Sequence, residues 1–190
     1  MTTNRVFTII FIIIGLIGGK LAFDAVFGQS DIAEYEDTDW SRSKCVGVTY
    51  EAPFELSPID LQLPPNVKKY IKTIENYKFE STPITFFISF SEYQPGVTPK
   101  IDGAVTGALR KMEAQKEISD FSYKVSNVDK NFIEGRLIRG TCKVDDKDAE
   151  ITAYFYYKNL KLLQIMTMNL SYPENCEIRD RIIKSLRIDL

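Results

Sequence analysis

Residues 121–172 read FSYKVSNVDKNFIEGRLIRGTCKVDDKDAEITAYFYYKNLKLLQIMTMNLSY, and this stretch decides the fold. Four segments in it are rich in the β-branched and aromatic residues that favour strands: 121–130, 131–144, 148–157 and 161–172. Short groups of Asp, Asn and Lys, which favour tight turns, separate these segments at 129–131, 145–147 and 158–159. Consecutive strands joined by tight turns predict an antiparallel meander.

The segment before the meander, ITFFISFSEY at residues 84–93, alternates apolar and polar side chains. Ile84, Phe86, Ile88 and Phe90 would lie on one face of a strand, with that face toward the core. Apolar residues at helical spacing predict one helix over residues 100–117, where Thr98 could cap the helix and Pro99 could begin it. The same spacing predicts a closing helix over residues 173–188.

The sequence also predicts the secondary structure of three segments before residue 80. KCVGVTY, residues 44–50, is a β-branched run that predicts one strand. Residues 52–65 carry four prolines and predict an extended loop with at most short edge pairings. Residues 65–79 place Val67, Ile74 and Tyr77 at helical spacing after Pro65, which predicts a helix. Hairpins together with helices on the sheet predict an α+β fold, an antiparallel sheet covered by helices.

The N-terminal stretch RVFTIIFIIIGLIGGKLAFDAVFGQS, residues 5–30, has the character of a membrane segment. Val6 to Gly19 carries no charge but spans only about 21 Å as a helix, less than a bilayer core of roughly 30 Å. Extension to Phe23 gives about 27 Å, and the Lys20 side chain could then reach the interface. The sequence favours an uncleaved transmembrane anchor, with a cleaved export signal as the first alternative and a buried helix as the second.

Charges around this stretch predict its orientation and the domain organisation. Arg5 precedes the apolar run, whereas acidic residues follow it in DIAEYEDTD, so the N-terminus should be inside and the rest of the chain outside. We therefore expect an anchor or signal segment at 1–28, a solvated acidic spacer at 29–39 and an extracytoplasmic domain at 40–190. If the segment is cleaved, the domain would be secreted or periplasmic.

Composition excludes several kinds of chemistry. The chain has no histidine, which rules out catalytic sites built on Ser-His or Cys-His pairs and metal sites that contain His. Residues 31–190 hold 22 basic and 25 acidic side chains, a net charge of −3, which disfavours nucleic acid as a partner. Cys45, Cys142 and Cys176 form no C-x-x-C pair. They are either three small buried hydrophobes or one disulfide and one thiol, with the pairing undetermined.

Candidate site motifs are weak, and each has a structural interpretation. Asp145, Asp146 and Asp148 could offer oxygen ligands to a cation, but their spacing is typical of a solvated hairpin turn. Gly135 and Gly140 lack the Lys-Ser/Thr of a phosphate-binding loop and indicate close backbone approach or a bulge.

Three further groups of side chains also have structural interpretations. Glu134 near Arg136 and Arg139 is typical of a strand surface, not of a catalytic pair. Ser185 and Lys184 are adjacent on a helix and do not face each other, which disfavours a Ser-Lys pair. Aromatic residues at 154–157 fall on both faces of one strand, so one pair should pack in the core and the other lie under a helix or form a recognition surface. We therefore assign no catalytic, cofactor-binding or metal-binding residue.

The order of elements over residues 80–190, with the strand LKLLQIMTMNLSY and a last helix that ends in RIIKSLRI, resembles the PsbP-like family. That resemblance implies an α/β/α sandwich and a non-enzymatic exported or scaffold protein that binds other proteins. It implies no particular binding residue.

The functional hypothesis is a membrane-tethered, non-enzymatic binding or scaffold domain outside the cytoplasm with a protein partner. One alternative is a carrier of lipid or another apolar ligand, which predicts a cavity lined by Phe86, Phe90, Phe155 and Met166. A second alternative is a carboxylate-based hydrolase, which predicts two acidic side chains that converge in a pocket.

Overall fold

The computed structural model describes residues 31–190 except Gln62, Thr82 and Thr98. The predicted anchor at 1–28 and the predicted cap at Thr98 therefore lie outside the described residues. Within the part of the chain that is described, no helix combines the length and the apolar character needed to cross a bilayer.

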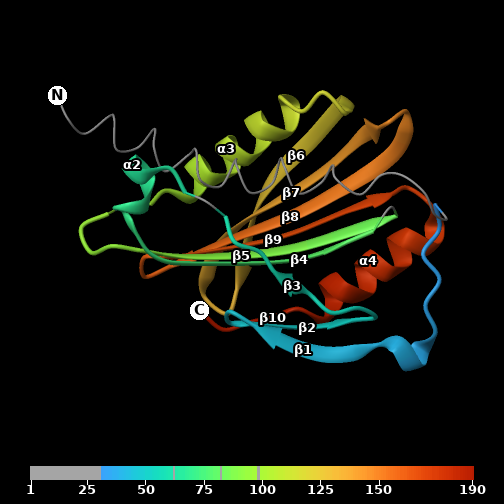
Figure 1. The fold of residues 1–190 in the computed structure, drawn as a ribbon, viewed down its shortest axis with the longest axis horizontal. Coiled ribbons are helices and arrows are strands. Elements are labelled where there is room, and N and C mark those ends of the chain that lie inside the picture. Colours follow the sequence, from blue (N-terminus) through green and yellow to red (C-terminus); the bar gives the residue numbers. More distant parts are fainter. Residues whose placement is uncertain (1–30, 62, 82, 98) are drawn as a thin grey trace.

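Two antiparallel sheets form the framework (Figure 1). The larger sheet has seven strands in the order β3-β4-β5-β9-β8-β7-β6. Its strands are β3 (Ser57–Pro58), β4 (Ile71–Glu80), β5 (Ile84–Tyr93), β6 (Ile118–Lys130), β7 (Ile133–Val144), β8 (Lys147–Lys158) and β9 (Lys161–Leu170). The smaller sheet has the order β1-β2-β10 and consists of β1 (Ser41–Cys45), β2 (Val48–Ala52) and β10 (Arg187–Ile188).

The antiparallel meander predicted over residues 121–172 is confirmed. Strands β6 to β9 follow one another in the chain and pair in the same order in the sheet. Each connecting turn places its two central residues in the left-handed region, with φ of 58° and 61° at Asn131 and Phe132. Two consecutive left-handed residues define the type I′ turn, whose twist matches that of the flanking strands.

Helices cover both faces of the large sheet, which confirms the α+β class. One face, here the α3 face, packs on α3 (Ile101–Glu113) and on α2 (Pro65–Lys68) through Phe87, Ile138, Phe155 and Met166. The opposite face, here the α4 face, packs on α4 (Pro173–Ser185) and on the small sheet through Phe86, Ile88, Leu163 and Ile165. Figure 1 shows α3 and α4 on opposite sides of the strands. Both helices fall within the ranges predicted for them.

The helix predicted over residues 65–79 is wrong. Only Pro65–Lys68 is helical, and the chain continues as β4, paired with β5 from Ile71 to Glu80. Strand β5 is buried along most of its length and would otherwise expose a row of unpaired backbone groups at a sheet edge. Strand pairing therefore overrides the helical spacing of the apolar residues.

The single strand predicted over residues 44–50 is also wrong, because a turn at Val46 and Gly47 divides it into β1 and β2. Gly47 has φ of 77°, and a Cβ there would collide with the carbonyl of Asp189. The glycine thus permits both the turn and the return of the C-terminus, where β10 pairs with β2. The loop predicted over residues 52–65 is confirmed, with β3 as its short edge pairing.

The described part of the acidic spacer, residues 31–39, contacts the domain rather than extending into solvent as predicted. Ala33 is buried, and Asp37–Asp39 form a short 3-10 helix, η1. Asp31 pairs with Lys147 at 2.6 Å, and Asp37 pairs with Arg181 at 2.6 Å. These exposed ion pairs add to the burial of Ala33 in attaching the spacer to the domain.

Candidate binding groove

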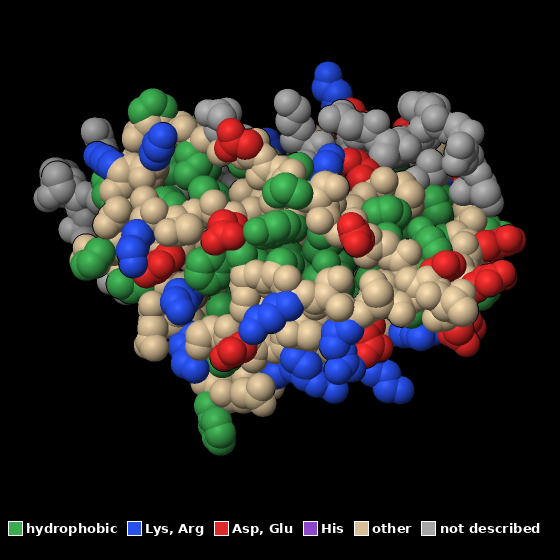
Figure 2. Space-filling model, turned by 60° about the horizontal axis from the view of Figure 1, so that its bottom comes forward, with side chains coloured by type: hydrophobic (Ala, Val, Ile, Leu, Met, Phe, Trp, Pro, Cys, Tyr) green, Lys and Arg blue, Asp and Glu red, His purple; other side chains and the backbone are tan. Residues whose placement is uncertain are grey.

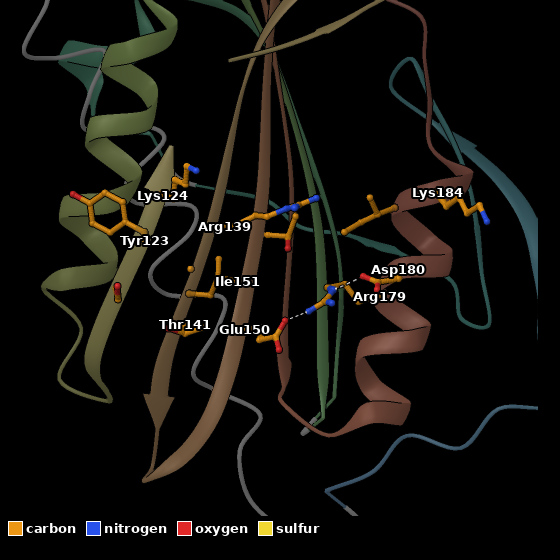
Figure 3. Close-up of a pocket in the computed structure, with 13 residues that line it drawn as sticks. Tyr123, Lys124, Arg139, Thr141, Glu150, Ile151, Arg179, Asp180 and Lys184 are labelled. Atoms are coloured by element: carbon orange, nitrogen blue, oxygen red, sulfur yellow. Dashed lines mark hydrogen bonds and ion pairs between the residues drawn. The ribbon is translucent and has the colours of Figure 1, made fainter. Parts of the chain in front are cut away.

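An open groove of about 670 Å³ lies on the α4 face, between α4 and strands β6, β7 and β8. Lys124, Arg139, Thr141 and Thr152 contribute to its floor, and Arg179 and Lys184 to its helical wall. Figure 3 shows Arg139 extending from its strand toward α4, and Arg179 extending from α4 toward Glu150. A groove of this size accommodates a peptide segment or a small ligand.

Strand register brings the floor residues together. Lys124 is paired with Arg139 across β6 and β7, and Arg139 is paired with Thr152 across β7 and β8. Side chains that are paired across antiparallel strands point to the same face of a sheet. The row Lys124, Arg139, Thr152 therefore crosses three neighbouring strands at one level.

Arg179 joins the wall of the groove to its floor. Its Nη1 donates hydrogen bonds to Glu150 and, at 3.4 Å, to Asn169, and its Nε donates to Asp180 at 2.8 Å. Its side chain is only 11% exposed. Burial acts to lower the pKa of Arg179, but the hydrogen bonds and charges of Asp180 and Glu150 outweigh burial and raise it. Arg179 is thus a permanent charge whose role is to hold α4 against β8.

The other cations that line the groove lack such partners. Lys124, Arg139 and Lys184 are exposed, and their side chains form no ion pair with any residue in the described ranges. Together with Arg179 they make four cations among the lining residues, against two carboxylates, Glu150 and Asp180, which leaves a local excess of +2 in a domain of net charge −3. Figure 2 shows Lys and Arg side chains gathered along the lower edge of the molecule.

The carboxylate and glycine motifs singled out in the sequence have structural roles. Arg136 binds Glu134 at 2.9 Å and Asp102 of α3 at 2.7 Å, so it faces α3, whereas Arg139 faces the groove. A Cβ on Gly135 would lie 2.8 Å from the ring of Tyr156, and one on Gly140 would lie 2.9 Å from the carbonyl oxygen of Ser122. Gly140 therefore marks a close backbone approach, as predicted, whereas Gly135 leaves room for the side chain of Tyr156.

The acidic turn and Ser185 also have structural roles. Asp145 and Asp146 occupy the β7–β8 turn, and Asp148 pairs with Lys143 at 3.0 Å. No group of three potential metal-ligating side chains occurs among the residues whose structure is described. Ser185 donates a hydrogen bond to the carbonyl of Ile182 at 2.7 Å and accepts one from the backbone N–H of Glu51 at 2.8 Å, so it ties α4 to β2.

The aromatic run at 154–157 divides between the two faces. Phe155 is fully buried on the α3 face, while Tyr154 and Tyr156 stack at 6.0 Å on the α4 face. Tyr156 packs in the same cluster as Ile178 and Ile182 of α4, so a helix covers this second pair. Burial raises the pKa of Tyr156 to about 12.

The single cavity predicted for a lipid carrier is not formed by its four residues. Phe86 packs on the α4 face, whereas Phe155 and Met166 pack on the α3 face. The body of the sheet separates the two sets, because neighbouring residues of a strand point to opposite faces.

All three cysteines are free thiols. Burial raises the pKa of Cys142 to about 11, and burial followed by the charge of Glu75 raises that of Cys45 to about 11. The pKa of Cys176 is also raised, mainly by burial. These shifts oppose formation of the reactive thiolate.

These elements define a PsbP-like fold, as the sequence resemblance predicted. Among solved structures, cyanobacterial PsbP (CyanoP) from Synechocystis is similar with a TM-score of 0.53 and 10% identity, over 85% of this chain and 98% of that one. The Saccharomyces cerevisiae Ran-binding protein Mog1p matches with a TM-score of 0.43 and 9% identity, over 78% of this chain and 95% of that one.

A third similar structure is LpqN of Mycobacterium tuberculosis, described as involved in cell envelope biogenesis, with a TM-score of 0.43, 11% identity, and coverage of 84% of this chain and 83% of that one. No protein-family model matches the chain, and no curated protein matches it significantly. At identities this low, similarity defines the fold alone.

Proposed function

We propose that this chain is a membrane-tethered, non-enzymatic binding domain that acts outside the cytoplasm and binds another protein through the groove beside α4. The observation that carries the proposal is the pair Lys124 and Arg139, two like charges opposed across β6 and β7. Such a pair destabilises a sheet by a few tenths of a kcal/mol up to about 1 kcal/mol. An anionic partner seated on the groove would remove that repulsion.

Protein is the favoured class of partner because of the shape and charge of the groove. It is open along the sheet rather than enclosed, and hydroxyl groups of Thr141 and Thr152 lie among its charges. Charge complementarity at a polar, accessible surface is typical of protein recognition and of specific encounter. The net negative charge of the domain makes nucleic acid a poor alternative.

The arrangement of carboxylates supports binding over hydrolysis. The two acidic side chains that line the groove, Glu150 and Asp180, both accept hydrogen bonds from Arg179, which lies between them (Figure 3). A carboxylate pair for hydrolysis needs one side chain to act as an acid and the other to be accessible to water or substrate. Here both carboxylates pair with the same arginine, which ties them to the contact between α4 and β8.

The membrane tether rests on the uncharged run from Val6 to Gly19 and its extension to Phe23. The acidic residues that follow it favour an outward orientation of the domain. Protease added to intact cells should therefore digest the domain while the cytoplasm stays protected. Digestion only after the membrane is permeabilised would contradict the outward orientation.

A photoreactive amino acid on the groove floor tests the binding function. We expect that placing it at Thr141 of the full-length chain, in its native membrane, yields a discrete adduct with another protein. The same group at Glu113, exposed at the end of α3, is the matched control and should not give that adduct. The double variant Lys124→Glu/Arg139→Glu should lower the adduct yield at Thr141 at least fivefold, because it reverses the charge of the floor. Equal adduct yields from Thr141 and Glu113, or no adduct from either position, would contradict the proposal.

A further inference from the structure

We propose that strand β6 is the docking strand of this domain, and that an extended partner segment with alternating acidic and apolar residues adds to its edge. The inference rests on the proposed binding function and specifies how the partner is held. It places the acidic side chains of that segment in the groove and its apolar side chains on the opposite face of the sheet.

Strand β6 is the terminal strand of the large sheet and is exposed along most of its length. Its pairing with β7 is irregular between Ser119 and Ser122 and then regular to Lys130. Exposed edge strands offer unpaired backbone groups to other chains, and proteins normally guard them with charges, bulges or covering segments. Here the irregular pairing protects only the beginning of β6 from the addition of another strand.

The turn that ends β6 determines which backbone groups face outward. In a two-residue type I′ hairpin, the residues that flank the turn, here Lys130 and Ile133, exchange both hydrogen bonds. The pattern then alternates along the strand, so that Lys124 faces β7 with its backbone groups. Tyr123, Val125 and Asn127 direct their N–H and C=O groups to the open edge. A partner strand would hydrogen-bond to these three residues.

Side chains on β6 form two different surfaces for such a strand. Lys124 lies on the α4 face beside Arg139, whereas Tyr123 and Val125 lie on the α3 face, paired with Gly140 and Ile138. Tyr123 is 43% exposed and Val125 is 39% exposed. Side chains of an added strand would alternate between these faces, so every second residue would lie on the α4 face near Lys124, and the residues between would lie on the α3 face near Tyr123 and Val125.

Exposed apolar side chains are concentrated at this edge. Four large hydrophobic side chains are exposed among the residues that the structure describes, and three of them, Tyr123, Val125 and Phe132, belong to β6 or to the turn that follows it. The charged residues at the far end of β6 are already engaged, since Lys130 donates to the carbonyl of Leu186 and Asp129 accepts from the N–H of Phe132. From Ser122 to Val128, Lys124 is the sole charged side chain. Exposed apolar side chains next to one unpaired cation favour a partner with the complementary alternation.

A peptide-binding experiment tests this mode with the full-length protein in detergent at about 50 mM salt, where surface charges are weakly screened. The probe is a fluorescein-labelled peptide of four Glu-Val repeats, and fluorescence anisotropy measures its dissociation constant. We expect this peptide to bind at least tenfold more tightly than a peptide of four Glu followed by four Val. N-methylation of alternate backbone nitrogens in the probe should abolish binding, because it removes the donors for β6.

Matched variants at Val125 separate strand addition from other modes of binding. Val125→Pro removes an outward N–H and should weaken probe binding at least tenfold, while the pairing of β6 with β7 is retained because Pro is tolerated at an edge where the N–H faces solvent. Val125→Thr keeps the N–H and should bind within about twofold of the natural chain. Circular dichroism and the melting temperature establish that both variants fold. Equal affinities of the two variants, or equal affinities of the alternating and block peptides, would overturn the proposal.

The same variants distinguish this inference from the proposed function. If Val125→Pro retains the adduct formed at Thr141 while Lys124→Glu/Arg139→Glu loses it, strand addition is refuted and the groove remains the binding site. If Val125→Pro and Lys124→Glu/Arg139→Glu both retain the adduct, the strand-addition proposal and the proposed binding groove are both refuted. If light scattering shows a dimer that Val125→Pro dissociates, the occupant of the edge is a second copy of this chain, and the acidic partner segment is refuted.

Discussion

Replacing Ile182 with alanine should lower the free energy of unfolding by about 2–5 kcal/mol, the range found when a large aliphatic side chain is removed from a packed core. Ile182 is 0% exposed and lies on the face of α4 that packs against the cluster of Phe86, Ile88 and Ile165. The loss combines the transfer free energy of the removed methylene and methyl groups with the cavity they leave. Urea denaturation followed by circular dichroism measures the effect.

Ile183→Ala is the matched control for this prediction. Ile183 is the next residue on the same helix, and it is only half-buried because it lines the groove. Its removal should cost about 1 kcal/mol or less, in keeping with a side chain that can relax into solvent. Equal losses in the two variants would show that α4 is not held by the face assigned to it here.

The fold was largely predictable because, in the segments that decide it, the local preference for strand or turn agrees with the pattern of buried side chains. The turns at Asn131, Asp145 and Asn159 separate strands that pair with their neighbours in the chain, so no long-range information is needed to order them. The helix prediction over residues 65–79 was wrong because apolar residues there also fall at helical spacing, so the local pattern favoured a helix. The observed strand β4 pairs with β5, the next strand in the chain, and the need of β5 for a neighbouring strand is a property of the whole sheet.

The groove was not predictable, because a small error in turn position changes which side chains meet. A three-residue turn over 129–131, as predicted, would pair Lys124 with Arg136, which binds Asp102 of α3. The observed turn at Asn131 and Phe132 pairs Lys124 with Arg139 instead. The register of β6 on β7 thus decides whether Lys124 lies beside Arg139 on the α4 face or beside Arg136, which Asp102 neutralises, on the α3 face. The signal that could have located the turn is Asn131, a residue type that readily adopts positive φ.

Replacing Asn175 with leucine should lower the free energy of unfolding by about 2–4 kcal/mol, because it leaves one buried and one half-buried backbone group without partners, and a buried group left unsatisfied costs about 1–3 kcal/mol. The Asn175 side chain is 0% exposed near the beginning of α4. Its Oδ1 accepts a hydrogen bond from the N–H of Ala33 at 2.9 Å, and its Nδ2 donates to the carbonyls of Asp31 at 3.0 Å and Leu170 at 3.3 Å. The carbonyl of Leu170 keeps a second donor in Asn169, so the loss falls on Asp31 and Ala33.

This asparagine is therefore the point at which the segment that leads from the proposed tether is fixed to the folded domain. Lys147→Ala is the matched control, since it removes only the ion pair with Asp31, whose two side chains are 43% and 35% exposed. Such a pair contributes up to about 1 kcal/mol, and the control should change stability by no more than that. Limited proteolysis should cleave Asn175→Leu within residues 31–36 much faster than the control, because the segment loses its anchoring bonds. Equal stability and equal cleavage in the two variants would show that surface charge, not the buried amide, holds the segment in place.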